Sequence, residues 1–147
     1  MMNKIILGFA IVISCLTFGQ KVKFKSGKVV VDKVEVFQIQ RVGDMETLST
    51  LDGKEICTVI YNVYQVRNPF PRTSYNSSSW TPYVDESVQT IKFIDLKKDI
   101  TTKLNLKDII NAIISSKIVN AEGSLNAEAV DRFEAKYNDE NAKLLIN

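Results

Sequence analysis

The stretch from Glu55 to Val66 restricts the fold more than any other part of the chain. Successive side chains of a β-strand point to opposite faces of its sheet, so a strand with one polar face lies against solvent. Both faces of this stretch are apolar. It therefore predicts a long strand in the middle of a sheet, with Ile56, Ile60, Tyr64 and Val66 on one face and Cys57, Val59, Tyr61 and Val63 on the other.

The residues before this strand also alternate, in shorter segments. Lysines alternate with apolar residues over residues 21–25, and Ser26-Gly27 predicts a turn into a second strand at residues 28–31. Apolar residues then continue as far as Ile39. They predict either a further strand or an extension of the second one.

Asp52-Gly53 is the clearest turn signal in the chain, because this pair readily takes the positive φ angles of a two-residue hairpin. It predicts that residues 46–51 pair with the long strand. Alternation returns at residues 87–95, and residues 99–104 are expected to pair with them.

The spacing of apolar residues then changes to that of helices. Asn105 is a good N-cap for a helix that ends near Ser116, and Asn126 is a good N-cap for a second helix that ends at Asn138. The tail at residues 142–146 is expected to add a short helical turn.

Together these patterns predict an α+β fold. Residues 21–104 are expected to form a mainly antiparallel sheet of about five or six strands, and two C-terminal helices within residues 105–147 are expected to pack on it. The full chain is 45% hydrophobic, and residues 20–147 have the size of one domain with its own core.

Residues 1–19 have the pattern of a secretory signal peptide. Lys4 is their only charge, and the apolar run at residues 5–18 is shorter than the roughly 20 residues that cross a bilayer. A small-x-small pattern ends at Gly19, so cleavage there would leave Gln20 first. We therefore expect a periplasmic or secreted protein with no transmembrane helix in the mature chain.

A lipid anchor is the alternative to soluble release. Residues 12–15 place an aliphatic residue and a small residue ahead of Cys15, as in a lipobox. A lipidated cysteine is usually followed by a polar tether, whereas here a strand-like segment begins within a few residues. The sequence therefore favours cleavage after Gly19 over lipidation at Cys15.

The chain contains no histidine. This excludes nucleophile systems that depend on histidine, histidine acid-base chemistry near neutral pH, and nearly every zinc site. Once the signal peptide is removed Cys57 is the only cysteine, so no intramolecular disulfide can form. We expect Cys57 to be a buried apolar side chain, with a reactive thiol as the alternative, and we expect no cofactor and no metal site.

The charge of the mature chain is close to neutral. Removal of Lys4 from the 19 basic residues leaves 18 against 17 acidic ones, a net charge of +1, which gives no support to nucleic-acid binding. Lys21, Lys23 and Lys25 would share one face of an edge strand. Such charges usually prevent pairing with other sheets, and contact with a membrane or polyanion is the alternative.

Residues 67–83 interrupt the β pattern with all three prolines, the only tryptophan and a cluster of Ser and Asn. Neither a helix nor a central strand tolerates this composition, so it predicts a long loop, and long loops in compact domains are either functional or disordered. We expect a protein or glycan partner to bind here; the alternative is an excursion whose aromatic side chains fold back on the sheet. The candidate binding residues are Arg67, Phe70, Arg72, Tyr75, Trp80 and Tyr83.

Carboxylates offer a second candidate chemistry, because two of them on facing segments suffice for sugar hydrolysis. Asp85 and Glu86 follow the aromatic loop, and Asp95 and Asp99 follow the next strand. Their spacing does not determine a separation in space. We therefore expect an enzymatic role less than a binding role.

Both ends of the chain resemble small exported proteins of the flavobacterial type. The resemblance lies in the Leu-Thr-Phe-Gly-Gln end of the signal segment, the hairpin at residues 49–54 and the C-terminal run from Gly123 to Tyr137. It implies export and lends no catalytic residues. We expect an exported, non-catalytic binding or envelope-accessory protein; the alternatives are a carboxylate-dependent hydrolase and an immunity or inhibitor protein for a secreted enzyme.

Overall fold

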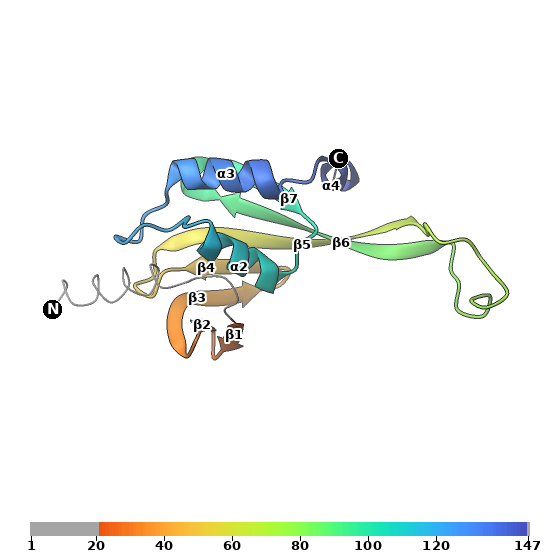
Figure 1. The fold of residues 1–147 in the computed structure, drawn as a ribbon, viewed down its shortest axis with the longest axis horizontal. Coiled ribbons are helices and arrows are strands. Elements are labelled where there is room, and N and C mark those ends of the chain that lie inside the picture. Colours follow the sequence, from red (N-terminus) through yellow and green to blue (C-terminus); the bar gives the residue numbers. More distant parts are fainter. Residues whose placement is uncertain (1–20, 147) are drawn as a thin grey trace.

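The computed structural model describes residues 21–146, which form one antiparallel sheet and three α-helices (Figure 1). Strands that are neighbours in the chain are also neighbours in the sheet. The predicted α+β class is confirmed, with seven strands where five or six were expected. The strands are β1 (Val22–Lys25), β2 (Lys28–Val31), β3 (Val34–Val42), β4 (Met45–Ser49), β5 (Glu55–Arg67), β6 (Tyr83–Phe93) and β7 (Lys98–Thr102).

Two tight turns shape the start of the sheet, and the second of them accounts for the larger number of strands. Ser26 and Gly27 both have positive φ, as a two-residue hairpin requires, and the predicted turn there is confirmed. Asp32 and Lys33 also have positive φ values, of 48° and 69°, and separate β2 from β3. Neither residue is a glycine, so the sequence carried no clear signal for this second reversal.

The expected two-residue turn at Asp52-Gly53 is wrong. Only Gly53 has a positive φ, and a wider loop is closed by a hydrogen bond from Thr50 N to Lys54 O at 2.8 Å. Thr50 is buried, and its hydroxyl accepts a hydrogen bond from Lys54 N at 3.0 Å and donates one to Asp52. These contacts stabilise a loop that starts before the Asp-Gly pair, so β4 ends at Ser49.

The helices begin and end where the sequence predicts. The Asn105 side chain accepts a hydrogen bond from the third residue of α2, and Asn126 does the same for α3. The second helix has its C-cap at Asn138, and the tail forms a third, short helix. The helices are α2 (Leu106–Ser115), α3 (Ala127–Tyr137) and α4 (Glu140–Ile146), and the 3-10 turn η1 (Ile94–Leu96) joins β6 to β7.

The core lies between the sheet and the apolar faces of α2 and α3 (Figure 1). Phe133 of α3 packs edge-on against Phe93 of β6, with ring centres 6.0 Å apart and planes at 81°. Three isoleucines of α2 are also fully buried: Ile109, Ile110 and Ile113. Because α3 contacts β7 and α2 contacts β1, the two helices bridge the sheet from one edge to the other.

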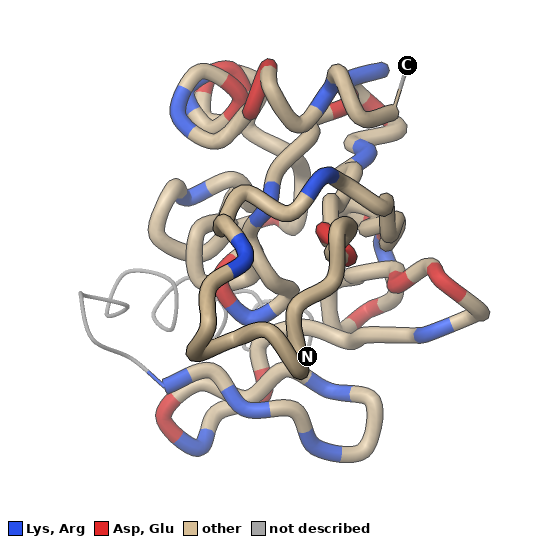
Figure 2. Tube along the Cα trace, turned by 90° about the vertical axis from the view of Figure 1, so that its right-hand side faces the viewer, with Lys and Arg blue, Asp and Glu red and all other residues tan. Residues whose placement is uncertain are grey.

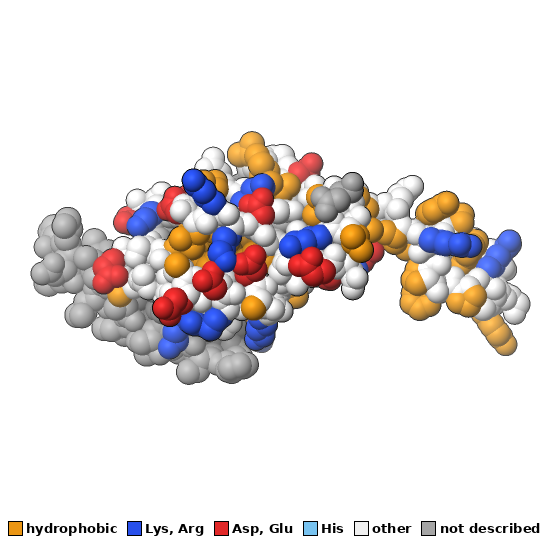
Figure 3. Space-filling view, turned by 90° about the horizontal axis from the view of Figure 1, so that it is seen from above, with side chains coloured by type: hydrophobic (Ala, Val, Ile, Leu, Met, Phe, Trp, Pro, Cys, Tyr) orange, Lys and Arg blue, Asp and Glu red, His pale blue; other side chains and the backbone are white. Residues whose placement is uncertain are grey.

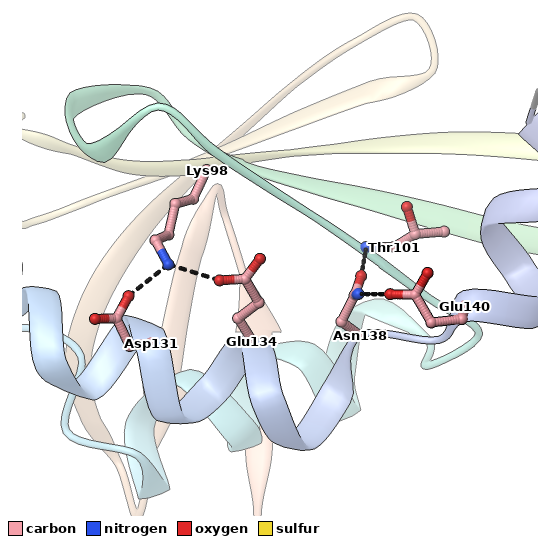
Figure 4. A network of polar contacts seen from close by, with 6 residues as sticks. All are labelled: Lys98, Thr101, Asp131, Glu134, Asn138 and Glu140. Atoms are coloured by element: carbon pink, nitrogen blue, oxygen red, sulfur yellow. Dashed lines mark hydrogen bonds and ion pairs between the residues drawn. The ribbon is translucent and has the colours of Figure 1, made fainter.

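Polar contacts fasten the C-terminal helices to the β7 edge (Figure 4). Lys98 Nζ lies 2.5 Å from Asp131 Oδ1 and 2.6 Å from Glu134 Oε2, and these hydrogen bonds raise the pKa of Lys98. The Asn138 side chain accepts a hydrogen bond from Thr101 N at 3.0 Å, and Asp139 N donates to Thr101 O at 2.7 Å. The edge of β7 is therefore partly covered, which limits its pairing with other chains.

The opposite edge of the sheet is charged. β1 pairs with β2 alone, and its Lys23 and Lys25 are exposed. Seen along the long axis of the molecule, Lys and Arg gather around the β1 and β2 hairpin at the lower end of the view (Figure 2). The predicted edge position of the lysine segment is confirmed.

The predictions for the N-terminus lie outside the described residues. They include cleavage after Gly19 and the alternative anchor at Cys15, and both stay predictions. Within residues 21–146, none of the helices is long and apolar enough to cross a membrane.

The structure supports the buried interpretation of Cys57. Its side chain is 0% exposed in β5, and burial, followed by the charge of Glu55, raises its pKa to about 12. The thiolate is the reactive form, so we expect the native protein to resist a thiol reagent such as DTNB at mildly alkaline pH. The unfolded protein in guanidinium is the control and should react at once. Labelling of the native protein at the rate of the unfolded chain would contradict this expectation.

Candidate functional site

β5 and β6 continue beyond the rest of the sheet as a two-stranded arm. β4 pairs with β5 only as far as Ile60, and β7 pairs with β6 only as far as Gln89. Six register pairs, from Asn62 with Val88 to Arg67 with Tyr83, join the two strands beyond those points. At about 3.4 Å per residue, the arm (residues 62–67 and 83–88) extends roughly 20 Å and carries the predicted loop at its far end (Figure 1). The loop was predicted over residues 67–83 but spans residues 68–82, because Arg67 and Tyr83 pair as the last rung of the arm. We call residues 67–83 the tip.

The arm corrects two expectations from the sequence. β6 begins at Tyr83, four residues before the predicted start at Ser87. The long strand β5 is central only over its first half, because beyond Ile60 it pairs with β6 alone and Val63 is 65% exposed. Burial still alternates along the arm, but its inner face is mostly half-buried and carries the polar residue Glu86, so the apolar alternation that marks a strand is weak there.

Cross-strand side-chain pairs accompany the backbone ladder of the arm. Val66 lies opposite Val84, and both are half-buried. Glu86, one rung nearer the sheet than Asp85, forms an ion pair with Lys103, which follows β7. An isolated two-stranded ribbon is only marginally stable in water, so contacts of this kind and the attachment to the sheet are needed to keep the arm formed.

Tyr61 anchors the root of the arm on the β5 side. Its hydroxyl donates a 2.6 Å hydrogen bond to Oε2 of Glu46, a nearly buried carboxylate on β4. Arg41 lies 6.0 Å above the Tyr61 ring and 3.9 Å from the other oxygen of Glu46. The first residue of β5 beyond the β4 ladder is thereby tied to two neighbouring strands.

Gln89, the register partner of Tyr61, anchors the root on the β6 side. Its side chain is buried. The orientation of its amide group is assigned from the hydrogen-bond donors and acceptors around it. The amide nitrogen donates to Leu104 O at 2.8 Å and to Thr102 O at 3.1 Å, and the amide oxygen accepts from the Ser87 hydroxyl at 2.9 Å. Both strands are therefore held by side-chain hydrogen bonds at the same level.

Two asparagines order the backbone of the tip. Asn68 accepts a hydrogen bond from Phe70 N at 3.0 Å and donates to Thr81 O at 2.8 Å, which joins the two ends of the tip. Asn76 accepts from Thr73 N at 2.7 Å and donates to Pro71 O at 3.1 Å. Backbone N–H and C=O groups that already have hydrogen-bond partners cost less free energy to remove from water when a ligand covers them.

Trp80 is part of this internal framework. Its side chain is half-buried, and its indole Nε1 donates a 2.8 Å hydrogen bond to Phe70 O. Its backbone N donates to Asn76 O at 2.8 Å. Of the six predicted binding residues, Trp80 therefore orders the tip, and this role does not require contact with a partner.

The other predicted residues present their side chains to solvent. Tyr75 is 99% exposed, Phe70 is 72% exposed, and Tyr83 at the base of the tip is also exposed. Arg67 and Arg72 are exposed and form no ion pair with any of residues 21–146. In the space-filling view the tip stands on a narrow neck, with apolar and basic atoms and no acidic ones on the face shown (Figure 3).

The structure thus places all six predicted residues in one projecting segment, away from the sheet. The alternative expected the aromatic side chains to fold back on the sheet, and they do not. Sequence reasoning missed the roles of Asn68, which precedes Pro69, and of Asn76, which lies in a Ser-rich turn-forming segment. Asn76 also begins an Asn-Ser-Ser glycosylation sequon, but its amide is already engaged with Thr73 and Pro71.

The candidate carboxylates do not form a pair. Asp85 and Glu86 are adjacent on β6 and so point to opposite faces of the arm. Asp99 lies 2.8 Å from Lys92, and Glu86 is paired with Lys103. Two of the four candidate carboxylates, Glu86 and Asp99, therefore serve as ion-pair partners of lysines.

The root of the arm generates a stability prediction. Tyr61→Phe removes the hydroxyl that donates to Glu46 and leaves a nearly buried carboxylate with one partner fewer, so we expect the free energy of unfolding to fall by about 1–3 kcal/mol. The matched control is Tyr64→Phe, on the same strand, because the Tyr64 hydroxyl has no hydrogen bond to the described residues. Chemical denaturation of both variants measures the difference, and equal losses would contradict the anchoring role.

The free energies of unfolding of the wild type and of Tyr61→Phe should also differ in their pH dependence. Burial, then the hydrogen bond and charge of Glu46, raise the pKa of Tyr61 above its ordinary value of 10.0, against a smaller opposite effect of Arg41. Above about pH 10 the unfolded chain loses this proton while the folded chain keeps it, which favours unfolding. The stability advantage of the wild type over Tyr61→Phe should therefore be full below about pH 10 and decrease as the pH rises further.

A further prediction concerns the order of the tip. Trp80→Phe keeps an aromatic ring but loses the hydrogen bond to Phe70 O, so we expect faster hydrogen exchange over residues 68–82 and faster trypsin cleavage after Arg72. Global stability should change little, because the tip lies outside the core. Tyr75→Phe is the control, since it removes an exposed hydroxyl with no partner among the described residues. Equal cleavage rates for the two variants would show that Trp80 does not order the tip.

Comparison with known proteins adds no function to this geometry. No protein-family model matches the chain, and neither a curated protein nor a solved structure matches it. The resemblance to small exported flavobacterial-type proteins therefore stays a prediction. The arm and its tip are the features from which a function must be argued.

Proposed function

We propose that the protein is an exported, non-catalytic binding protein that engages its partner through the tip. One observation carries this proposal: Phe70 and Tyr75 project into solvent from an internally hydrogen-bonded segment held about 20 Å beyond the sheet. Large aromatic side chains on a soluble domain are usually buried. Their exposure at the end of an ordered arm has a direct explanation if they are buried on binding.

The construction of the tip favours binding over a merely mobile loop. A binding loop that is disordered when free must be ordered in the complex, and each immobilised side chain reduces the affinity. Here Asn68, Asn76 and Trp80 already hold the backbone in one arrangement. Less ordering is left for the moment of binding, so more of the contact energy appears as affinity.

Export is supported by the sequence alone. The N-terminal segment has a charge, an apolar run and a small-residue end, and the remainder is free of histidine and able to fold without a disulfide. The immunity or inhibitor alternative is one form of the same binding function, with a secreted enzyme as partner. The hydrolase alternative gains no support, because two of its four candidate carboxylates are already paired with lysines.

The test places the photo-crosslinker benzoylphenylalanine at position 75 in the full-length protein, expressed in its source cells. The matched control carries it at position 94, because Ile94 is also exposed and lies at the other end of β6. We expect an adduct from position 75, none from position 94, and loss of the adduct when Phe70→Ala is added. Mass spectrometry of the exported sample should find Gln20 as the first residue.

Two outcomes would contradict the proposal. If position 75 yields no more adduct than position 94, the tip is not a binding site. If the protein in cells retains Met1 and fractionates with the cytoplasm, the export part is wrong.

A further inference from the structure

We infer that the partner of the tip is a folded protein with an apolar recess whose rim carries carboxylates. This inference rests on the proposed binding function and deepens it, because it names the chemistry of the partner. It follows from the charge of the tip, the direction of its aromatic side chains and the polar groups around them.

The charge of the tip is positive and uncompensated. Arg67 and Arg72 are its only charged residues, and the segment from residue 68 to residue 84 contains no Asp or Glu. Neither guanidinium group has a carboxylate partner among residues 21–146. Arginine forms planar, paired hydrogen bonds with carboxylates, so the two free guanidinium groups are complementary to acidic groups on a partner.

The apolar groups of the tip require a recess. Phe70 and Tyr75 are exposed residues of the tip, and the tip is a narrow projection (Figure 3). A convex surface buries most area when it enters a concave one. Aromatic anchors that fill pockets contribute a large share of binding energy in protein interfaces. The indole N–H of Trp80 is already bonded to Phe70 O, so this part of the tip can also be covered without leaving a donor unsatisfied.

The polar groups of the tip match those of protein-binding loops. Antibody loops combine Tyr, Ser and Asn with Trp and Arg, because rigid aromatic rings supply area and small polar groups adapt to a protein surface. The tip has the same residue types, with hydroxyls beside the aromatic residues at Ser74, Ser77, Ser78 and Ser79. This is the composition expected at the edge of a protein interface, which is polar and wet.

Other classes of partner fit less well. Recognition of anionic lipid usually takes a cluster of about four to eight basic residues, whereas the tip has two and is surrounded by hydroxyls. A neutral glycan would leave both guanidinium groups without partners. A nucleic acid is disfavoured because the tip offers only two basic side chains and Asp85 follows it closely in the chain.

The experiment uses the partner isolated from the adduct at position 75. Its dissociation constant for the full mature chain is measured at about 50 mM and about 500 mM salt. We expect Arg67→Glu and Arg72→Glu each to weaken binding about 10-fold or more, and Tyr75→Ala to weaken it by a similar or larger factor. Lys23→Glu is the matched control, because it makes the same charge change on the far β1 edge, and it should leave binding unchanged.

A charge exchange makes the test specific. The adduct identifies the segment of the partner near position 75, and its Asp and Glu residues are changed singly to Arg. At least one such change should weaken binding of the wild type and restore part of the binding of Arg72→Glu. Vesicles of phosphatidylglycerol and phosphatidylethanolamine, and the acidic polysaccharide alginate, serve as probes of the other partner classes.

The outcomes separate this inference from the proposed function. Binding that depends on Tyr75 but not on salt or on either arginine would overturn the inference and leave the binding function in place. So would an adduct with lipid or polysaccharide, or binding to the vesicles or to alginate that is lost with Tyr75→Ala. Absence of any adduct specific to position 75 would overturn both.

Discussion

The pairing of β5 with β6 is the interaction on which the rest of the structure depends. Its ladder is the longest in the sheet, with ten register pairs. Over the inner pairs the side chains enter the core, where Val59 and Ile91 are buried opposite each other. Over the outer pairs one face of the two strands is exposed and the other is mostly half-buried. A ribbon of that kind is marginal alone, so burial at one end of the ladder maintains the exposed end.

The change from body to arm occurs at one level of the ladder, and polar side chains mark it. Tyr61 and Gln89 face each other there, and each bonds to a segment that does not enter the arm. Hydrogen bonds are directional, whereas apolar contacts are not. The direction in which the tip points is therefore set at the root, by a carboxylate on one side and backbone carbonyls on the other.

Prediction from the sequence succeeded where a structure depends on residues close in the chain, and it failed where the structure depends on residues far apart in the chain. The helices were predicted well because Asn105 and Asn126 act on their own first turns. The turn at Asp32 and Lys33 was missed because its geometry is determined by the pairing of β2 with β3. The first residues of β6 were missed because Asp85, Glu86 and Ser87 interrupt the apolar pattern by which strands are recognised, although their burial alternates. The tip was recognised from composition, but the internal role of Trp80 became evident only from its distance to Phe70 O.

The separation of Phe70 and Tyr75 from the core has a consequence for how this protein can evolve. Substitutions of core residues such as Phe133 are limited by packing, since changes of even one methylene are felt there. Substitutions at the exposed tip positions meet no such limit, provided that Asn68, Asn76 and Trp80 maintain the scaffold. Exchange of a few side chains at the tip can then change which surface the protein binds, while the residues of the core that determine folding stay the same.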